Sequence, residues 1–184
     1  MRLLDAINMV LPRLGERPVT STEVKHPTLA VLLPIFDRVR KQLLMQGWWF
    51  NTYRYTAYPN SDGVIDIGAN TLKFIPDPEY PAVVRGRQLY NTKTLTYKFD
   101  TPVSGVVVHD LPFDALQESA ADYVLNTASI EAISTDIGVT QELQVWQAMA
   151  NAAYNQLMQE HLQQMRYSTK NTKTWKKIQR ALRS

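Results

Sequence analysis

Three carboxylates at four-residue spacing, Asp114, Glu118 and Asp122, are the side chains of this sequence best placed to do chemistry together. On a helix this spacing puts all three on one face. Paired carboxylates beside an exposed aromatic platform can cleave a glycosidic bond, but no spacing in the sequence brings such a platform to these acids. A solvated helix face accounts for the same residues, and so does a negative wall that repels a passing polyanion.

The histidines give no sign of a metal or catalytic centre. None of His26, His109 and His161 is followed by a second metal ligand three or four residues along the chain. The sequence also lacks cysteine, a glycine-rich phosphate loop and a dinucleotide-binding fingerprint. We therefore predict no catalytic residue, no metal site and no cofactor, and expect all three histidines to be structural or to lie on the surface.

Charge is distributed in three blocks along the 184 residues. Residues 1–98 carry 13 basic and 8 acidic side chains, residues 99–165 carry 9 acids and no lysine or arginine, and residues 166–184 carry 7 basic side chains and no acid. The long stretch without a cation argues against a broad DNA-binding face, because phosphate contacts need lysine and arginine.

The basic end of the chain is the sharpest local pattern. Its apolar residues fall at i, i+3 and i+7, which predicts a short basic amphipathic helix. About ten residues are too few for a stable isolated helix, so we expect it to order on an acidic groove, a nucleic acid or a membrane surface. A frayed terminus is the alternative, although a solvated tail gains nothing from a tryptophan. The residues concerned are Lys170, Lys173, Trp175, Lys176, Lys177, Ile178, Arg180, Leu182 and Arg183.

The stretch GWWFNTYRY, residues 47–55, concentrates aromatic side chains after a predicted helix. Neighbouring tryptophans point in different directions on a helix or a strand, so Trp48 and Trp49 cannot both enter one core in the same way. We hypothesise that one of them anchors the helices while the other, with Phe50 and Tyr53, contacts a neighbouring subunit. The alternative is that both lie in one monomer's core.

Hydrophobic periodicity predicts the helices that must position these residues. An amphipathic helix is expected over 2–14, closed by Gly15, and a second over 27–46, kinked at Pro34. The longest helix is expected over 140–167. Before it, a third helix is expected with Asp110 as N-cap and Pro112 in its first turn. The residues predicted to share one face of this helix are Leu116, Ala120, Tyr123, Thr127 and Ile130.

Between the second and third helices, residues 48–111 predict five or six short antiparallel strands, separated by turn residues. The expected strand segments after the aromatic stretch are VIDI, LKFIP, AVVRGRQLY, LTYKF and VVVHDL. No strand–helix alternation occurs, which excludes a doubly wound fold.

We therefore predict an α+β fold with a bundle of about four helices, a β-rich insertion and a basic extension. The predicted divisions are residues 1–47 and 112–168 for the bundle, 48–111 for the insertion and 169–184 for a docking tail. No signal peptide or membrane-spanning segment is predicted, because Asp5 and Asn8 interrupt the first apolar run.

Three segments resemble the tail tubular protein A family, the head-to-tail adaptors of short-tailed, podovirus-type bacteriophages. The opening AINMVLPRLGERPV is similar to that family's first helix and Gly-x-x-Pro-Val turn, and QGWWFNT to its Gly-Trp-x-Phe-Asn signature. The later LPFDALQESAADYVLNTAS resembles the Leu-Pro opening of its third helix. The chain departs from the family in its glutamine-rich last helix and in its strongly basic tail.

The resemblance implies a structural virion protein rather than an enzyme. It implies a homo-oligomeric, twelve-fold ring under the portal protein, with a nozzle of the tail tubular protein B type below and genomic DNA passing through without specific binding. The protein would be made in the host cytoplasm and reside at the head–tail junction, without a membrane partner. In that setting the basic tail would dock on portal, and Asp114, Glu118 and Asp122 would face the lumen. The alternatives are a nucleic-acid-binding module that uses the basic tail and a tail-associated glycan hydrolase.

Overall fold

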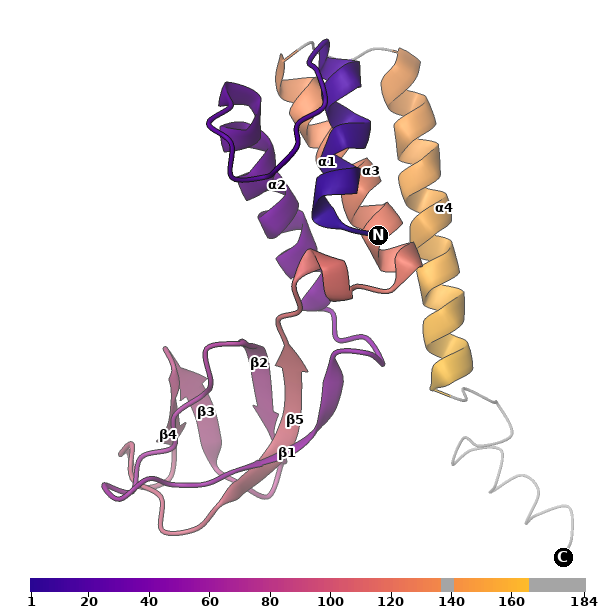
Figure 1. Cartoon of the computed structure of the whole chain (residues 1–184). Helices are drawn as coiled ribbons and strands as arrows, with labels where there is room; N and C mark the ends of the chain where they lie inside the picture. The colour runs from indigo at the N-terminus through magenta and orange to yellow at the C-terminus, as the bar shows by residue number, and fades with distance from the viewer. Residues whose placement is uncertain (137–140, 166–184) are drawn as a thin grey trace, which may run out of the picture.

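The computed structural model describes residues 1–136 and 141–165, which form helices around a β-rich insertion (Figure 1). The helices are α1 (Leu3–Val10), α2 (Pro27–Leu44), α3 (Glu118–Asp136) and α4 (Gln141–Gln164), with 3-10 helices η1 (Leu11–Leu14) and η2 (Phe113–Ala115). The strands are β1 (Thr52–Ala57), β2 (Thr71–Pro76), β3 (Ala82–Arg85), β4 (Gln88–Asn91) and β5 (Val103–His109). The predicted α+β fold, with antiparallel strands inserted between the second and third helices, is confirmed.

The first predicted helix is divided into two parts by its proline. Pro12 has no N–H to donate to the turn before it, so the α-helical ladder stops and η1 continues the chain. Gly15 then adopts φ +75°, as predicted for the C-cap, and its N–H donates to the Pro12 carbonyl at 3.2 Å. The Asn8 side chain holds the following turn by exchanging two hydrogen bonds of 2.8 and 2.9 Å with the Val19 backbone.

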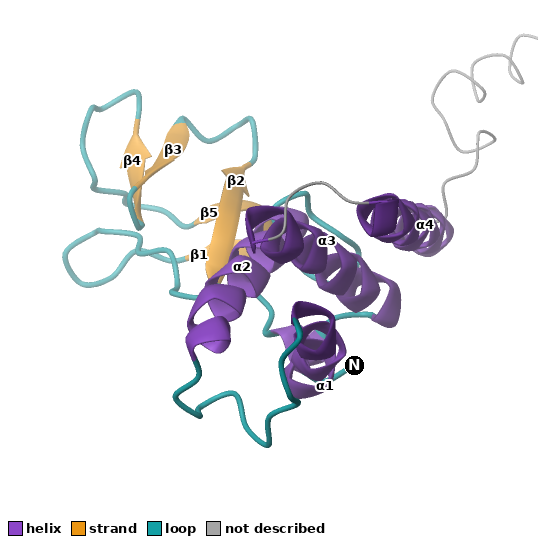
Figure 2. Ribbon diagram, turned by 90° about the horizontal axis from the view of Figure 1, so that it is seen from above, coloured by secondary structure: helices purple, strands orange, loops and turns teal. Residues whose placement is uncertain are grey.

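Three helices form a row, and α3 is the middle one (Figure 2). It packs on α2 on one side and on α4 on the other, while α1 lies against the row near α3. Pro27 opens α2 as predicted, and the helix continues through Pro34. The kink expected at Pro34 stays a prediction.

The third helix is covered on most sides, and few of the residues predicted to share a face are among its most buried ones: Leu116 precedes α3, while Tyr123, Thr127 and Ile130 are half-buried. From Ser119 to Ile133 no side chain is exposed. Its alanines and serines let neighbouring helices approach closely, and Ser129 donates to the Leu125 carbonyl at 2.7 Å on the same helix.

The start of the third helix also differs from the prediction. The chain makes η2 after Pro112 and enters α3 only at Glu118. Asp110 is therefore not an N-cap, because its carboxylate is engaged by Arg40 of α2.

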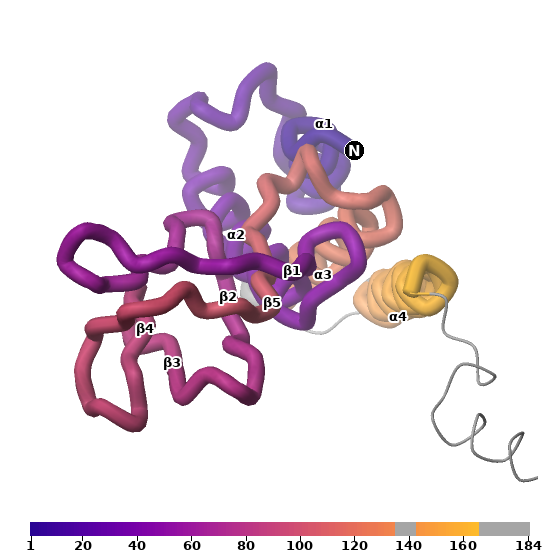
Figure 3. Tube along the Cα trace, turned by 90° about the horizontal axis from the view of Figure 1, so that it is seen from below, coloured from indigo at the N-terminus to yellow at the C-terminus, as the bar shows by residue number. Residues whose placement is uncertain are grey.

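The insertion contains a three-stranded sheet and a separate hairpin (Figure 3). β5 lies between β1 and β2 and pairs antiparallel with both. The segment AVVRGRQLY, predicted as one strand, forms the β3–β4 hairpin, since Gly86 adopts φ +61° between paired Arg85 and Gln88. VIDI and LTYKF make isolated bridges instead of the predicted strands, but they supply Ile65 and Phe99 to the core of the insertion.

Two hydrophobic clusters result. The larger joins the helices and includes Trp48 and Phe113, and the smaller fills the insertion around Phe74, Leu89 and Val107. Among the described helices, none combines the length and apolar character needed to cross a membrane. The exact division of the chain into bundle, insertion and tail stays a prediction.

Gly105 in the central strand is a point where a larger side chain has no room. A Cβ added there would lie 2.4 Å from the Ile75 carbonyl oxygen and 2.9 Å from Cζ of Phe74. We expect Gly105→Ala to destabilise the protein by about 1–3 kcal/mol, because backbone of the paired strand must move. Chemical denaturation measures the change. Gly68→Ala is the matched control, since the nearest atom to its added Cβ lies at 3.9 Å. Equal stability of both variants would contradict the packing described for β5.

Candidate functional site

Trp48 fastens the end of α2 to α4. Its side chain is 2% exposed, and its indole Nε1 donates to the Leu43 carbonyl at 2.8 Å. The ring meets Tyr154 and His161 of α4 edge-on, at centroid distances of 6.0 and 5.4 Å. Trp48 is thus one of the anchors of the helical core.

The other aromatics of the stretch lie progressively further outward. Trp49 is half-buried, 4.9 Å from the Phe50 ring and 6.0 Å from the His161 ring. Tyr53 is 47% exposed, and its hydroxyl forms a hydrogen bond with Nε2 of His109. Trp48 and Trp49 therefore both contact α4, but only Trp49 keeps accessible surface. Contact of Trp49, Phe50 and Tyr53 with a neighbouring subunit stays a prediction.

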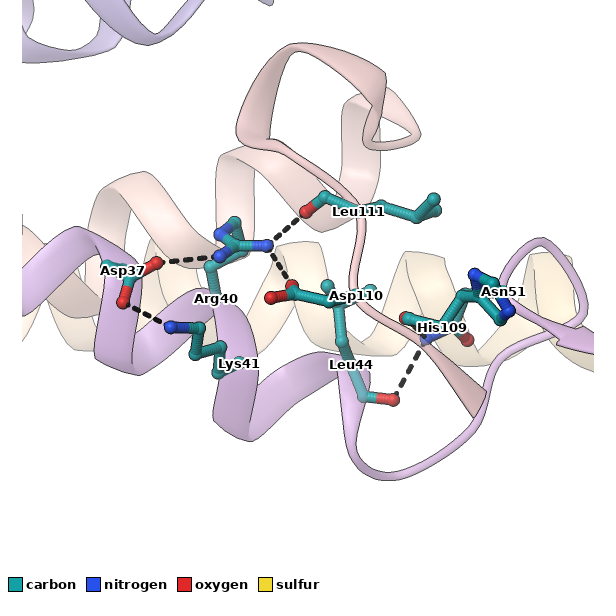
Figure 4. A network of polar contacts seen from close by, with 8 residues as sticks. All are labelled: Asp37, Arg40, Lys41, Leu44, Asn51, His109, Asp110 and Leu111. Carbon is teal, nitrogen blue, oxygen red and sulfur yellow. Dashed lines mark hydrogen bonds and ion pairs between the residues drawn. The ribbon is translucent and has the colours of Figure 1, made fainter. Parts of the chain in front are cut away.

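Asn51 ties the two crossings between bundle and insertion to each other (Figure 4). Its Oδ1 accepts a hydrogen bond from the Trp48 N–H at 2.8 Å, and its Nδ2 donates to the carbonyls of Leu44 and His109, both at 3.0 Å. The Asn51 carbonyl also accepts from the His109 N–H at 2.8 Å. This side chain, 1% exposed, thus satisfies backbone groups of α2, of the turn and of β5.

Gly47 makes that turn possible. It adopts φ +82°, and a Cβ there would lie 3.2 Å from Oγ1 of Thr52. The glycine, tryptophan and asparagine of GWWFN therefore belong to the joint between the helical bundle and the insertion. We call Gly47, Trp48 and Asn51, together with the ion pair of Arg40 and Asp110 beside them, the joint.

Arg40 supports the joint from within α2. Its guanidinium bonds to the carboxylates of Asp110 and Asp37 and to the Leu111 carbonyl (Figure 4). Burial by itself lowers the pKa of Arg40, but the hydrogen bonds to Asp110 and Asp37 outweigh it and raise that pKa. Burial likewise opposes ionisation of Asp37, while the hydrogen bonds from Lys41 and Arg40 bring its pKa below the usual value. The cluster is therefore a fixed ion network between α2 and the end of β5.

The three candidate acids do not lie on one helix, since Asp114 belongs to η2 and only Glu118 and Asp122 belong to α3. They nevertheless gather around the start of the chain. Glu118 accepts from the Met1 ammonium at 2.7 Å, and Asp114 accepts from the Leu3 N–H at 2.6 Å. Burial, followed by the charge of Glu118, raises the pKa of Asp122. These contacts give the acids a role within the monomer; a lumen-facing position stays a prediction.

A groove of about 400 Å³ runs between α1, α3 and α4. Its walls include Met9, Leu125 and Met149, and the guanidinium of Arg13 lies 3.4 Å from the centre of the Trp146 ring. Desolvation lowers the pKa of Arg13. In residues 1–136 and 141–165 no group of three or more histidine, aspartate or glutamate side chains is arranged to hold a metal ion.

The predicted docking tail, with Trp175 at its centre, lies outside the described residues. The residues that the sequence reasoning did not single out are Asn51, quoted only as part of a motif, and Arg40. An asparagine four residues after the glycine that follows a helix is the sequence feature that could have pointed to Asn51. No local pattern identifies Arg40 as part of the joint, because Asp110, its partner across the joint, is 70 residues away.

Two comparisons with known proteins give the same family. The family model described as "Tail tubular protein" matches residues 4–167. The chain is 33% identical over 184 residues to "Tail tubular protein A" of Klebsiella phage KP34, a match that covers 98% of each chain. The match therefore includes the helices, the insertion and the joint.

Asn51 offers a direct test of the joint. We expect Asn51→Ala to lower the free energy of unfolding by about 2–4 kcal/mol, because it removes the Asn51 bonds to the His109 carbonyl and the Trp48 N–H and leaves the Leu44 carbonyl with the Gly47 N–H alone. Asn51→Asp should cost at least as much, since it sets a carboxylate against two carbonyl oxygens. Denaturant unfolding gives both values, with exposed Asn155→Ala of α4 as the control. A loss below about 0.5 kcal/mol for Asn51→Ala would contradict the role given to this side chain.

Proposed function

This chain belongs to the tail tubular protein family, and from that premise we propose that it is the head-to-tail connector of a bacteriophage particle. As a member of the family it is a structural protein of the phage tail. We propose further that copies of it form a ring, twelve-fold by resemblance to the family, between portal above and nozzle below. Genomic DNA would pass through that ring without specific binding.

The observation that carries the proposal is the match to tail tubular protein A over 98% of both chains. The joint supports it physically, because a closed ring repeats one contact between copies, and a fixed angle between bundle and insertion presents the same surfaces in every copy. Directional hydrogen bonds from Asn51 and the ion network of Arg40 resist bending where the chain crosses between bundle and insertion.

The aromatics beside the joint are proposed as part of a subunit contact. Trp49 and Tyr53 retain exposed surface next to a buried anchor, and tryptophan and tyrosine are common energetic centres of protein interfaces. Asp114 in η2 and Glu118 at the start of α3 are exposed. Together with the half-buried Asp122, they are proposed to face the DNA passage, where negative charge would discourage phosphate binding.

The basic tail is proposed to dock on portal, with Trp175 buried and its lysines against acidic walls. Avidity would strengthen this contact, because each copy in a ring adds one tail. A nucleic-acid-binding role for the same tail predicts DNA affinity that falls steeply with salt.

Deleting residues 169–184 tests the tail. We expect the shortened chain to keep the thermal stability of the full chain but to lose docking to purified portal, measured by co-sedimentation. The full chain with Trp175→Ala should show an intermediate loss, because only the apolar anchor is missing. Unchanged docking by the shortened chain would give the tail another role, and salt-sensitive binding of the full chain to DNA would identify that role.

Separate alanine substitutions at the two tryptophans test the aromatic contact. Trp48→Ala should destabilise the monomer by about 3–5 kcal/mol, since it empties a buried site. Trp49→Ala should cost less stability but weaken self-assembly, observed by negative-stain imaging and sedimentation. If both variants only lower the melting temperature and assembly persists, the aromatic contact is not at a subunit interface.

A further inference from the structure

From Leu143 to Gln164, the outward side of α4 carries no formal charge. We define the α4 face by exposed residues on the side opposite the buried Leu143, Ala150, Ala153 and Leu157: Gln144, Val145, Ala148, Asn151, Asn155 and Gln159. Between Leu143 and Met165 no exposed side chain is Lys, Arg, Asp or Glu. The acid in that range, Glu160, is half-buried and accepts hydrogen bonds from Ser119 and Gln156.

Such a face is unusual for a helix that meets only water. Exposed helix surfaces normally carry charged side chains, whereas the centres of protein interfaces are depleted in them. Val145 is 60% exposed, and Met149 beside the face is 50% exposed. Apolar side chains exposed to this extent favour a protein partner over a hydrated DNA passage.

A second uncharged surface lies at the opposite edge of the helix row. We define the α2 face by the exposed residues of its first turns: Pro27, Ala30, Val31 and Pro34. Val31 is 54% exposed. The charged side chains that follow along α2 have partners within the chain, because Arg38 bonds to Glu131 and Lys41 bonds to Asp37 at 2.8 Å. The four residues of the α2 face are uncharged, so burying them does not itself desolvate an ion.

The two faces are placed so that one copy can meet the next. α3 separates α2 from α4, so the faces point to opposite sides of the row (Figure 2). The α2 face lies in the first turns of α2, the α4 face starts in the first turn of α4, and the two helices begin at the same end of the bundle (Figure 1). Different surfaces on opposite sides of a subunit are what a head-to-tail contact between identical copies requires.

We propose that the α4 face of one copy packs against the α2 face of the next. The inference rests on the proposed ring and specifies which surfaces build it. Pro34 also leaves an acceptor on the α2 face, because a proline has no N–H to donate to the Ala30 carbonyl four residues earlier. Side-chain amides of the α4 face, such as Gln144, are donors that can satisfy this oxygen. Apolar contact between Val31 and Val145 would occur without burying an ion.

Cysteine pairs test the contact directly, since the chain has none of its own. The full chain with both Val31→Cys and Val145→Cys is assembled and treated with a short bis-maleimide. We expect a ladder of covalent oligomers on a denaturing gel, because each copy links to two neighbours. A mixture of the two single variants should give dimers but no ladder, and each single variant alone should stay monomeric on the gel.

The outcomes separate this inference from the proposed function. Assembly without links between positions 31 and 145 overturns the inference and leaves the connector ring intact. Links formed by one single variant alone indicate a two-fold contact and also overturn it. If the wild-type chain fails to self-assemble even with portal present, the proposed ring fails together with the inference.

A charge placed in the contact gives a second measurement. Val145→Asp should raise the concentration needed for self-assembly at least tenfold while the melting temperature stays near that of the wild type. Leu95→Asp, at a site 68% exposed in the insertion, is the matched control and should assemble normally. Normal assembly of Val145→Asp would show that this face stays in solvent or lines the DNA passage.

Discussion

The structure depends on a small hydrogen-bonded joint at which the chain leaves the helices and returns to them. Only a few residues separate α2 from β1, and only a few separate β5 from η2, so both crossings lie side by side. The Asn51 side chain bonds to the helix end on one crossing and to the strand end on the other. Buried, directional contacts of this kind fix an angle as well as a distance, which apolar packing alone does less well.

The helical part is organised by small residues in its central helix. α3 supplies alanine and serine where α2 and α4 approach, and larger apolar residues come from the flanking helices and from Trp48. Because α3 is covered on both sides, α2 and α4 form the two edges of the helix row. Each of these two helices packs on α3 with one face and turns the other outward, where another copy can contact it.

The features of the fold that could be predicted are those set by residues close together in the sequence. The helix stop at Gly15, the start of α2 at Pro27 and the turn at Gly47 are set by backbone preferences of single residues. The predicted helix cap at Asp110 is wrong, because the preference of aspartate for that position is weak compared with its bond to Arg40. The candidate acids were expected on one helix face, but η2 shifts Asp114 off α3 while the chain's first residues bring the acids together.

By itself, the sequence determined the fold class, the order of elements and the family, since periodicity, turn residues and motifs act over a few neighbours along the chain. Only the tertiary structure decided which tryptophan is the anchor, why Asn51 is needed and which sides of α2 and α4 stay open. Those properties arise from contacts between residues such as Arg40 and Asp110, far apart in the chain. Burial and partner choice depend on what packs alongside, and spacing along one segment does not contain that information.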